Sequence, residues 1–120
     1  MSSLENFVNR GVHCIIKIMS TNIQGRFYYH FKHNPKVSVN NYAYEVIGLA
    51  KHTETGEITV VYRPLYENEW LQGEASLFSR PLAMFIDTVN KPEYTGPRFR
   101  LIEDPDIKLK LNDIRDQMYK

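Results

Sequence analysis

The chain has 120 residues, of which 42% are hydrophobic and 24% charged, and its formal net charge at pH 7 is +1. This length and composition are typical of one globular domain and exclude a disordered chain. No run approaches the roughly 20 apolar residues of a membrane-spanning helix, so we expect no membrane span. The small net charge excludes a bulk field that would attract long nucleic acid or acidic lipid, so anion binding requires a local patch.

The single cysteine, Cys14, cannot form a disulfide within the chain. Its apolar neighbours Ile15 and Ile16 favour a buried, inert thiol over a reactive one. The apolar stretch around it is interrupted by His13 and Lys17 and lacks a small-residue cleavage site, which argues against a signal peptide. A free thiol suits a reducing compartment, and we therefore expect a cytoplasmic protein.

Residues 3–19 are predicted to form a helix, because apolar side chains recur there at spacings of three and four residues. Ser2 and Glu5 have the spacing of a capping box. Gly11 costs a helix ~1 kcal/mol, and the β-branched run after it would serve equally well as a strand. The apolar stripe consists of Leu4, Phe7, Val8, Val12, Ile15, Ile16 and Met19. Residues 1–24 are thus an N-terminal extension for which we favour helix.

From residue 26 the period of the pattern changes to two. The aromatic side chains Phe27, Tyr29 and Phe31 alternate with Tyr28, His30 and Lys32. This alternation is typical of a half-buried strand, which we place at residues 26–33. Residues 34–41 contain Pro35 and three asparagines and are predicted to be a loop.

Residues 42–50 and 58–66 are predicted to pair as a β-hairpin. In the second strand Ile58, Val60 and Tyr62 alternate with Thr59, Val61 and Arg63. Gly56 in the short connection suits a positive φ. Pro64 has no amide hydrogen, which places that end of the strand at a sheet edge or a bulge.

The following segment contains shorter elements. Polar residues 67–76 predict a mobile loop, and residues 80–85 predict one helical turn that packs Leu82 and Phe85 inward. Short strands are predicted at residues 86–89 and 99–102. The connection between them contains Pro92, Gly96 and Pro97 and is interpreted as a loop.

A terminal amphipathic helix is predicted in residues 103–120. Asp104 suits the N-cap position and Pro105 the first helical position. The apolar stripe of this helix consists of Ile107, Leu111, Ile114 and Met118. The helix therefore follows a β-rich core at residues 25–102.

These elements predict one domain over residues 1–120, mainly of β class. Five or so short strands with tight turns favour a small barrel or a strongly curved antiparallel sheet, because an open sheet of this size leaves edges that pair with other chains. The flanking helices could cover the open end or present an apolar face to a partner.

Several strings of residues occur in an order typical of one family. They are Tyr29–Asn34 (YHFKHN), Asn41–Gly48 (NYAYEVIG), His52–Glu57 (HTETGE), Val60–Tyr66 (VVYRPLY), Arg80–Phe85 (RPLAMF) and Pro97–Phe99 (PRF). With this set, residues 25–102 resemble a bacterial family known as domain of unknown function 1653. The resemblance implies a short β-rich module with an SH3-like barrel and no established activity. The family's usual arginine before the strand histidine is replaced by Tyr29, so no role of that arginine carries over.

Neither a metal site nor a catalytic site is predicted. His30 and His33 point to opposite sides of a strand, and the chain has no second thiol and no His-x-x-x-His pair, which disfavours zinc. Cys14 and the distant His52 lack the strained turn of an activated nucleophile. We therefore expect no cofactor and no metal.

The remaining signal is a set of aromatic side chains mixed with cations. Tyrosine rings offer flat faces on which bases stack, and arginine forks bind phosphate or carboxylate. The alternative is that the tyrosines line the barrel wall and the arginines pair with nearby glutamates. The predicted ligand-binding residues are His30, Lys32, Tyr44, Arg63, Tyr66 and Arg80.

The leading hypothesis is a non-catalytic module that binds an anionic, ring-containing ligand: a nucleotide, a nucleotide-derived signal or a short single strand of nucleic acid. The small net charge disfavours long duplex, which would require several phosphate contacts. The alternative is a protein-interaction module or homo-oligomer that uses the terminal helices or the edge near Pro64. A nucleotide-directed hydrolase is the third hypothesis.

Overall fold

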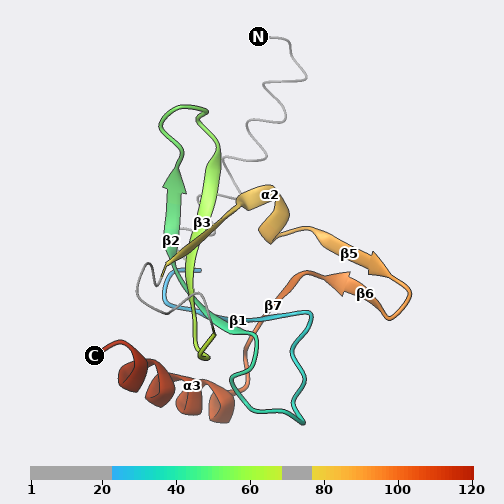
Figure 1. Cartoon of the computed structure of the whole chain (residues 1–120), viewed down its shortest axis with the longest axis vertical. Helices are drawn as coiled ribbons and strands as arrows, with labels where there is room; N and C mark the ends of the chain where they lie inside the picture. The colour runs from blue at the N-terminus through green and yellow to red at the C-terminus, as the bar shows by residue number, and fades with distance from the viewer. Residues whose placement is uncertain (1–22, 69–76) are drawn as a thin grey trace.

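The computed structural model describes residues 23–68 and 77–120. The main sheet is antiparallel, in the order β4-β3-β2-β1-β7, with β1 (Phe27–His30), β2 (Ala43–Lys51), β3 (Ile58–Pro64), β4 (Phe78–Pro81) and β7 (Phe99–Leu101). A separate hairpin consists of β5 (Thr88–Lys91) and β6 (Tyr94–Pro97), and the helices are α2 (Leu82–Phe85) and α3 (Pro105–Met118). The predicted mainly β class and terminal helix are therefore confirmed (Figure 1).

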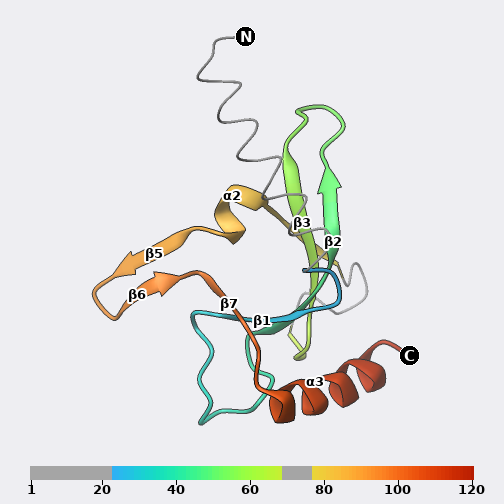
Figure 2. The ribbon, with the colours of Figure 1, turned by 180° about the vertical axis from the view of Figure 1, so that it is seen from behind.

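Within the described ranges the sheet does not close into the expected barrel. Its end strands, β4 and β7, are paired only with β3 and β1 respectively. The segment between them forms α2 and the β5–β6 hairpin, whose strands pair with each other instead of joining the two edges. Figure 2 shows this hairpin projecting to the side of the sheet. The expected N-terminal helix lies outside the described residues, as does most of the predicted loop at 67–76.

The predicted β2–β3 hairpin is confirmed. The amide of Gly56 donates to the His52 carbonyl (2.7 Å), and Gly56 has a φ of +76°, which glycine adopts without a steric penalty. The register shifts between Val46 and Gly48, so that one extra residue forms a bulge in β2. Val46 and Leu49 consequently pack in the same hydrophobic cluster. Without the bulge, their spacing of three residues would place them on opposite faces of the strand.

Two features of residues 77–97 differ from the sequence prediction. Residues 78–81 form the edge strand β4 before the helical turn, and the expected loop around Pro92 and Gly96 contributes β6. Pro81 and Pro97 each stand last in a strand, where a missing amide hydrogen is tolerated. The sequence pattern placed Pro81 in the helical turn and Pro97 in a loop, although both lie in strands.

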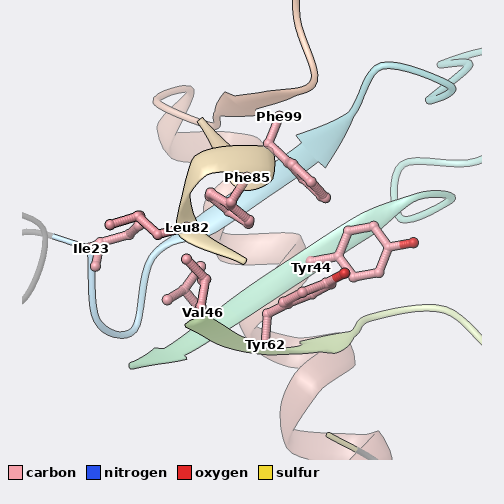
Figure 3. Close-up of a cluster of buried hydrophobic side chains, with 8 residues drawn as sticks. Ile23, Tyr44, Val46, Tyr62, Leu82, Phe85 and Phe99 are labelled. Atoms are coloured by element: carbon pink, nitrogen blue, oxygen red, sulfur yellow. The ribbon is translucent and has the colours of Figure 1, made fainter. Parts of the chain in front are cut away.

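Alternating side chains of the main sheet form a hydrophobic cluster on each of its faces. On one face, Ile23 at the start of the described chain packs with side chains of the sheet and of α2 (Figure 3). This upper cluster consists of Ile23, Tyr44, Val46, Val60, Tyr62, Leu82, Phe85 and Phe99. On the opposite face, the lower cluster consists of Phe27, Tyr29, Ala43, Leu65, Ile102 and Leu111.

Helix α3 covers the face of the lower cluster, where Leu111 is fully buried. Its N-cap is confirmed, because the Asp104 carboxylate accepts hydrogen bonds from the amides of Asp106 (2.9 Å) and Ile107 (3.3 Å). At the other end, the Tyr119 hydroxyl donates to the Pro64 carbonyl (2.5 Å). In the part of the chain described, no helix has the length and apolar character needed to cross a bilayer.

Candidate functional site

A pocket of about 610 Å³ opens beside the upper cluster. It is lined by His30, Lys32, Tyr42, Tyr44, Tyr62, Tyr66, Asn68, Phe78 and Arg80. The structure thus brings together five of the six residues predicted to bind ligand, namely His30, Lys32, Tyr44, Tyr66 and Arg80. The sixth, Arg63, is not among the lining residues.

The antiparallel register places these side chains next to one another. Tyr62 on β3 lies opposite Val46 on β2 and Phe78 on β4, while Arg80 lies opposite Val60. Alternation along β2 and β3 directs Tyr44 and Tyr62 to the same face. Figure 3 shows both hydroxyl groups pointing away from Ile23 and Leu82, which leaves the rings in the core and the polar ends at the pocket.

A hydrogen bond of 2.7 Å joins the hydroxyl groups of Tyr44 and Tyr66. Burial raises the pKa of Tyr44 far above its usual value, and the hydrogen bond with Tyr66 raises it further. Burial also raises the pKa of Tyr66. Both phenols therefore stay protonated at physiological pH and offer neutral hydrogen-bonding groups to the pocket.

Tyr42 has a left-handed backbone conformation, with a φ of +53°, and among the described residues no other residue except glycine has a positive φ. This region is unfavourable for a bulky aromatic residue, and such strain is concentrated at functional sites. The Tyr42 carbonyl accepts a hydrogen bond from the amide of His30 (2.9 Å), which holds this turn against β1. The strained turn presents the Tyr42 ring to the pocket.

Arg80 supplies a positive charge to the pocket. Its Nε donates a 3.2 Å hydrogen bond to the Tyr62 hydroxyl, and its Cζ lies 5.4 Å from the centre of the Phe99 ring. Within residues 23–68 and 77–120 no carboxylate forms an ion pair with this guanidinium. Its terminal nitrogens therefore retain their capacity to bind an anion.

His30 is a neutral imidazole at physiological pH. Burial is the largest cause that lowers its pKa, and together with the positive charges of Arg80, Lys32, Arg98 and Lys91 it lowers the pKa from 6.5 to about 4. Its Nδ1 accepts a hydrogen bond from the Lys32 amide (3.2 Å), so the ring proton resides on Nε2. The side chain thus offers a hydrogen-bond donor in a positively charged environment.

Arg63 points to the opposite face of the sheet. Its Nε donates to Oε1 of Glu45 (2.8 Å), and its Cζ lies 4.0 Å from the centre of the Tyr119 ring. Glu45 is only 4% exposed and also accepts a hydrogen bond from Nη1 of Arg115 (2.7 Å). The contacts of Arg63 agree with the alternative considered from the sequence, in which the arginines pair with nearby glutamates.

Four residues of the pocket lining were not predicted as contacts from the sequence, namely Tyr42, Tyr62, Asn68 and Phe78. Tyr62 shares its strand face with buried Val60 and was interpreted as part of the hydrophobic pattern. The orientation of the Phe78 side chain could not be predicted, because the strand β4 that contains it was not predicted. No group of three or more potential metal ligands occurs in the described ranges, and the pocket lining within them contains no carboxylate.

Comparisons with known proteins place the chain in a family. A crystal structure of a DUF1653 protein from Bordetella bronchiseptica is similar, with a TM-score of 0.52 and 26% sequence identity over 69% of this chain and 91% of that chain. No curated protein matches the chain. The family described as "Protein of unknown function (DUF1653)" matches residues 26–101. The resemblance seen in the sequence is confirmed, and the chain belongs to the DUF1653 family.

Proposed function

We propose that this protein is a non-catalytic module that binds an anionic, ring-containing ligand in the pocket beside the upper cluster. The observation that carries the proposal is the lining itself, in which four tyrosines, two cations and a neutral histidine surround one space without a described carboxylate. The ligand class comprises nucleotides, nucleotide-derived signals and short single strands of nucleic acid.

The hydrogen-bonding chemistry of the lining matches a phosphate. Arg80 and Lys32 provide charged donors, and His30 adds a neutral one. Charge-assisted hydrogen bonds of this kind are the strong ones in phosphate recognition. The tyrosine rings supply flat surfaces for the ring of the ligand.

The size of the pocket also suits such a ligand. Its volume of about 610 Å³ lies within the range of roughly 300–1,000 Å³ found for small-molecule sites. A mononucleotide unit has both the flat ring and the anion that the lining can bind.

The test is calorimetric titration of the full chain with mononucleotides, cyclic dinucleotides and short oligonucleotides. We expect binding by at least one of these, and an Arg80→Ala variant that binds about tenfold or more weakly, because a charge-assisted hydrogen bond contributes roughly 1.5–3 kcal/mol. Arg100→Ala is the matched control, because Arg100 is exposed on β7 and does not line the pocket. Absence of binding at millimolar ligand, or an unchanged affinity of Arg80→Ala, would contradict the proposal.

The protein-interaction alternative would need an apolar face of the C-terminal helix that is free to bind a partner. The apolar residues Ile107, Leu111 and Ile114 pack against the lower cluster of the same chain. Leu109, which is 65% exposed, is a single apolar residue on the outer side of this helix. The pocket is therefore the better supported site.

A further inference from the structure

A second group of aromatic and basic side chains lies next to the pocket. The rings of Phe31 and Tyr94 are stacked, with their centres 5.3 Å apart and an interplanar angle of 18°. The Lys91 ammonium lies 5.2 Å from the centre of the Phe31 ring. Tyr94 and Lys91 belong to the β5–β6 hairpin, and Phe31 directly follows β1.

Ring contacts connect this group to the pocket without interruption. The ring centres are 5.5 Å apart for Tyr66 and Tyr42, 5.7 Å for Tyr42 and His30, and 4.4 Å for His30 and Phe31. All of these side chains are half-buried, so each is partly accessible. We call Tyr66, Tyr42, His30, Phe31 and Tyr94 the aromatic track.

Positive charges accompany the aromatic track over its length. Lys32 and Arg80 line the pocket, and Lys91 lies at the hairpin end. Arg98 is also near, but its Nε is engaged by Oδ1 of Asp87 at 2.7 Å. Flat rings that alternate with cations are the surface that binds single strands, because bases stack on the rings while lysine and arginine contact the phosphates.

We propose that the ligand is a single strand of nucleic acid, with one nucleotide in the pocket and the next stacked over Phe31 and Tyr94. This inference rests on the proposed function of the pocket and specifies its ligand class. A free mononucleotide would use the pocket alone and would not engage the hairpin end of the track. The net charge of +1 is compatible with a short bound segment that contacts few phosphates.

The first experiment measures affinity against ligand length by fluorescence anisotropy or calorimetry. The ligands are a mononucleotide and oligonucleotides of about two, four and eight nucleotides, each as RNA and as DNA of the same sequence. Affinity is expected to rise by about fivefold or more from the mononucleotide to the short oligonucleotides, because each stacked base adds a measurable contribution. Comparison of the RNA series with the DNA series shows which kind of strand binds more tightly. Equal affinities for ligands of all lengths would overturn the inference.

The second experiment uses variants at the hairpin end. Lys91→Gln is expected to weaken oligonucleotide binding by several fold and to reduce the slope of log K against log salt by about 0.7, with no effect on the mononucleotide. Lys110→Gln on the exposed side of α3 is the control with the same charge change. Phe31→Leu keeps apolar bulk but removes the ring, and is also expected to affect oligonucleotides alone.

These outcomes separate the two proposals. If the mononucleotide binds and Arg80→Ala weakens it, but Lys91→Gln and Phe31→Leu bind oligonucleotides like the wild type, the inference is wrong and the proposed function stands. If neither a mononucleotide nor an oligonucleotide binds, the proposed function fails. Because Lys91 is exposed, Lys91→Gln provides this test even if Phe31→Leu loosens the hairpin.

Discussion

At the scale of single residues, Phe99 connects the hydrophobic core to the pocket. Its ring is stacked on Phe85, with centres 4.3 Å apart, and meets His30 edge-on at 5.2 Å. Arg80 lies over the same ring. The histidine and the arginine are therefore held by one buried aromatic residue, which brings a neutral donor and a cation together.

The lowered pKa of His30 predicts a dependence of stability on pH. The pKa of the His30 imidazole is 6.5 in the unfolded chain and about 4 in the folded one, so between these pH values the unfolded state binds more protons. The stability from neutral His30 is full above pH 6.5 and is lost as the pH falls toward 4. Denaturant unfolding at several pH values should show this loss, and His30→Gln should reduce it. An NMR titration that gives a pKa near 6.5 would contradict the prediction.

Gly96 permits the close approach of Tyr94 within the β5–β6 hairpin. A Cβ at Gly96 would lie 2.7 Å from the Tyr94 hydroxyl, which donates to the Pro97 carbonyl at 2.7 Å. We therefore expect Gly96→Ala to displace the Tyr94 ring and to lower the free energy of unfolding by about 1 kcal/mol. NMR shifts of the Tyr94 ring protons check this, with Gly48→Ala as a control in open space.

At the scale of elements, the docking of α3 depends on charges as well as apolar contacts. Glu45 on β2 is buried and binds Arg63 on the neighbouring strand and Arg115 on the helix. A buried carboxylate that binds one guanidinium on the sheet and one on the helix specifies how the helix lies, since any other position separates Oε2 of Glu45 from Arg115. Figure 1 shows α3 lying across the sheet at the end opposite the β2–β3 hairpin tip.

Removing the central charge should loosen this helix. Glu45→Gln is expected to lower the free energy of unfolding by about 2 kcal/mol, below the value for fully buried pairs because the two arginine side chains are 23% and 25% exposed. Asp116→Asn is the control, because this exposed carboxylate contacts the same Arg115 and a surface pair contributes little. Hydrogen exchange of α3 amides measures the local effect, and equal stability losses in the two variants would contradict the prediction.

At the scale of the whole molecule, one sheet separates two hydrophobic clusters that differ in what covers them. The lower cluster is covered by α3, whereas the upper cluster is only partly covered by α2 and borders the pocket. Because β2 contributes Tyr44 and Val46 to the upper cluster and Ala43 to the lower one, we expect the two clusters to unfold together. A packed interior transmits a local loss of contacts through the shared strand.

Core truncations on the two faces test this cooperativity. Leu65→Ala below the sheet and Phe85→Ala above it should each lower the free energy of unfolding by about 3 kcal/mol. Each variant should still show a single transition by circular dichroism and by tyrosine fluorescence. Two separated transitions in either variant would show that the faces unfold independently.

Elements with a local signal were predicted from the sequence. The β2–β3 hairpin was indicated by alternation on both sides of Gly56, and α3 by its cap and apolar stripe, and both are confirmed. β4 and β6 were missed because they are short and contain or adjoin proline and glycine. The pairing of β4 with β3 joins segments that are separated in the sequence, for which a local pattern gives no signal. β6 pairs with the adjacent β5, but its proline and glycine favoured a loop.

For the site, the sequence determined the residue types and only the tertiary structure decided their grouping. Alternation already placed His30 and Lys32 on one face of a strand, and a mixture of tyrosines and cations was visible without a structure. Whether Arg63 or Arg80 faces the pocket depended on strand phase and on the burial of Glu45, which are set by pairing between distant segments. The open sheet was decided in the same way, because closure requires β4 and β7 to meet and the intervening hairpin pairs with itself.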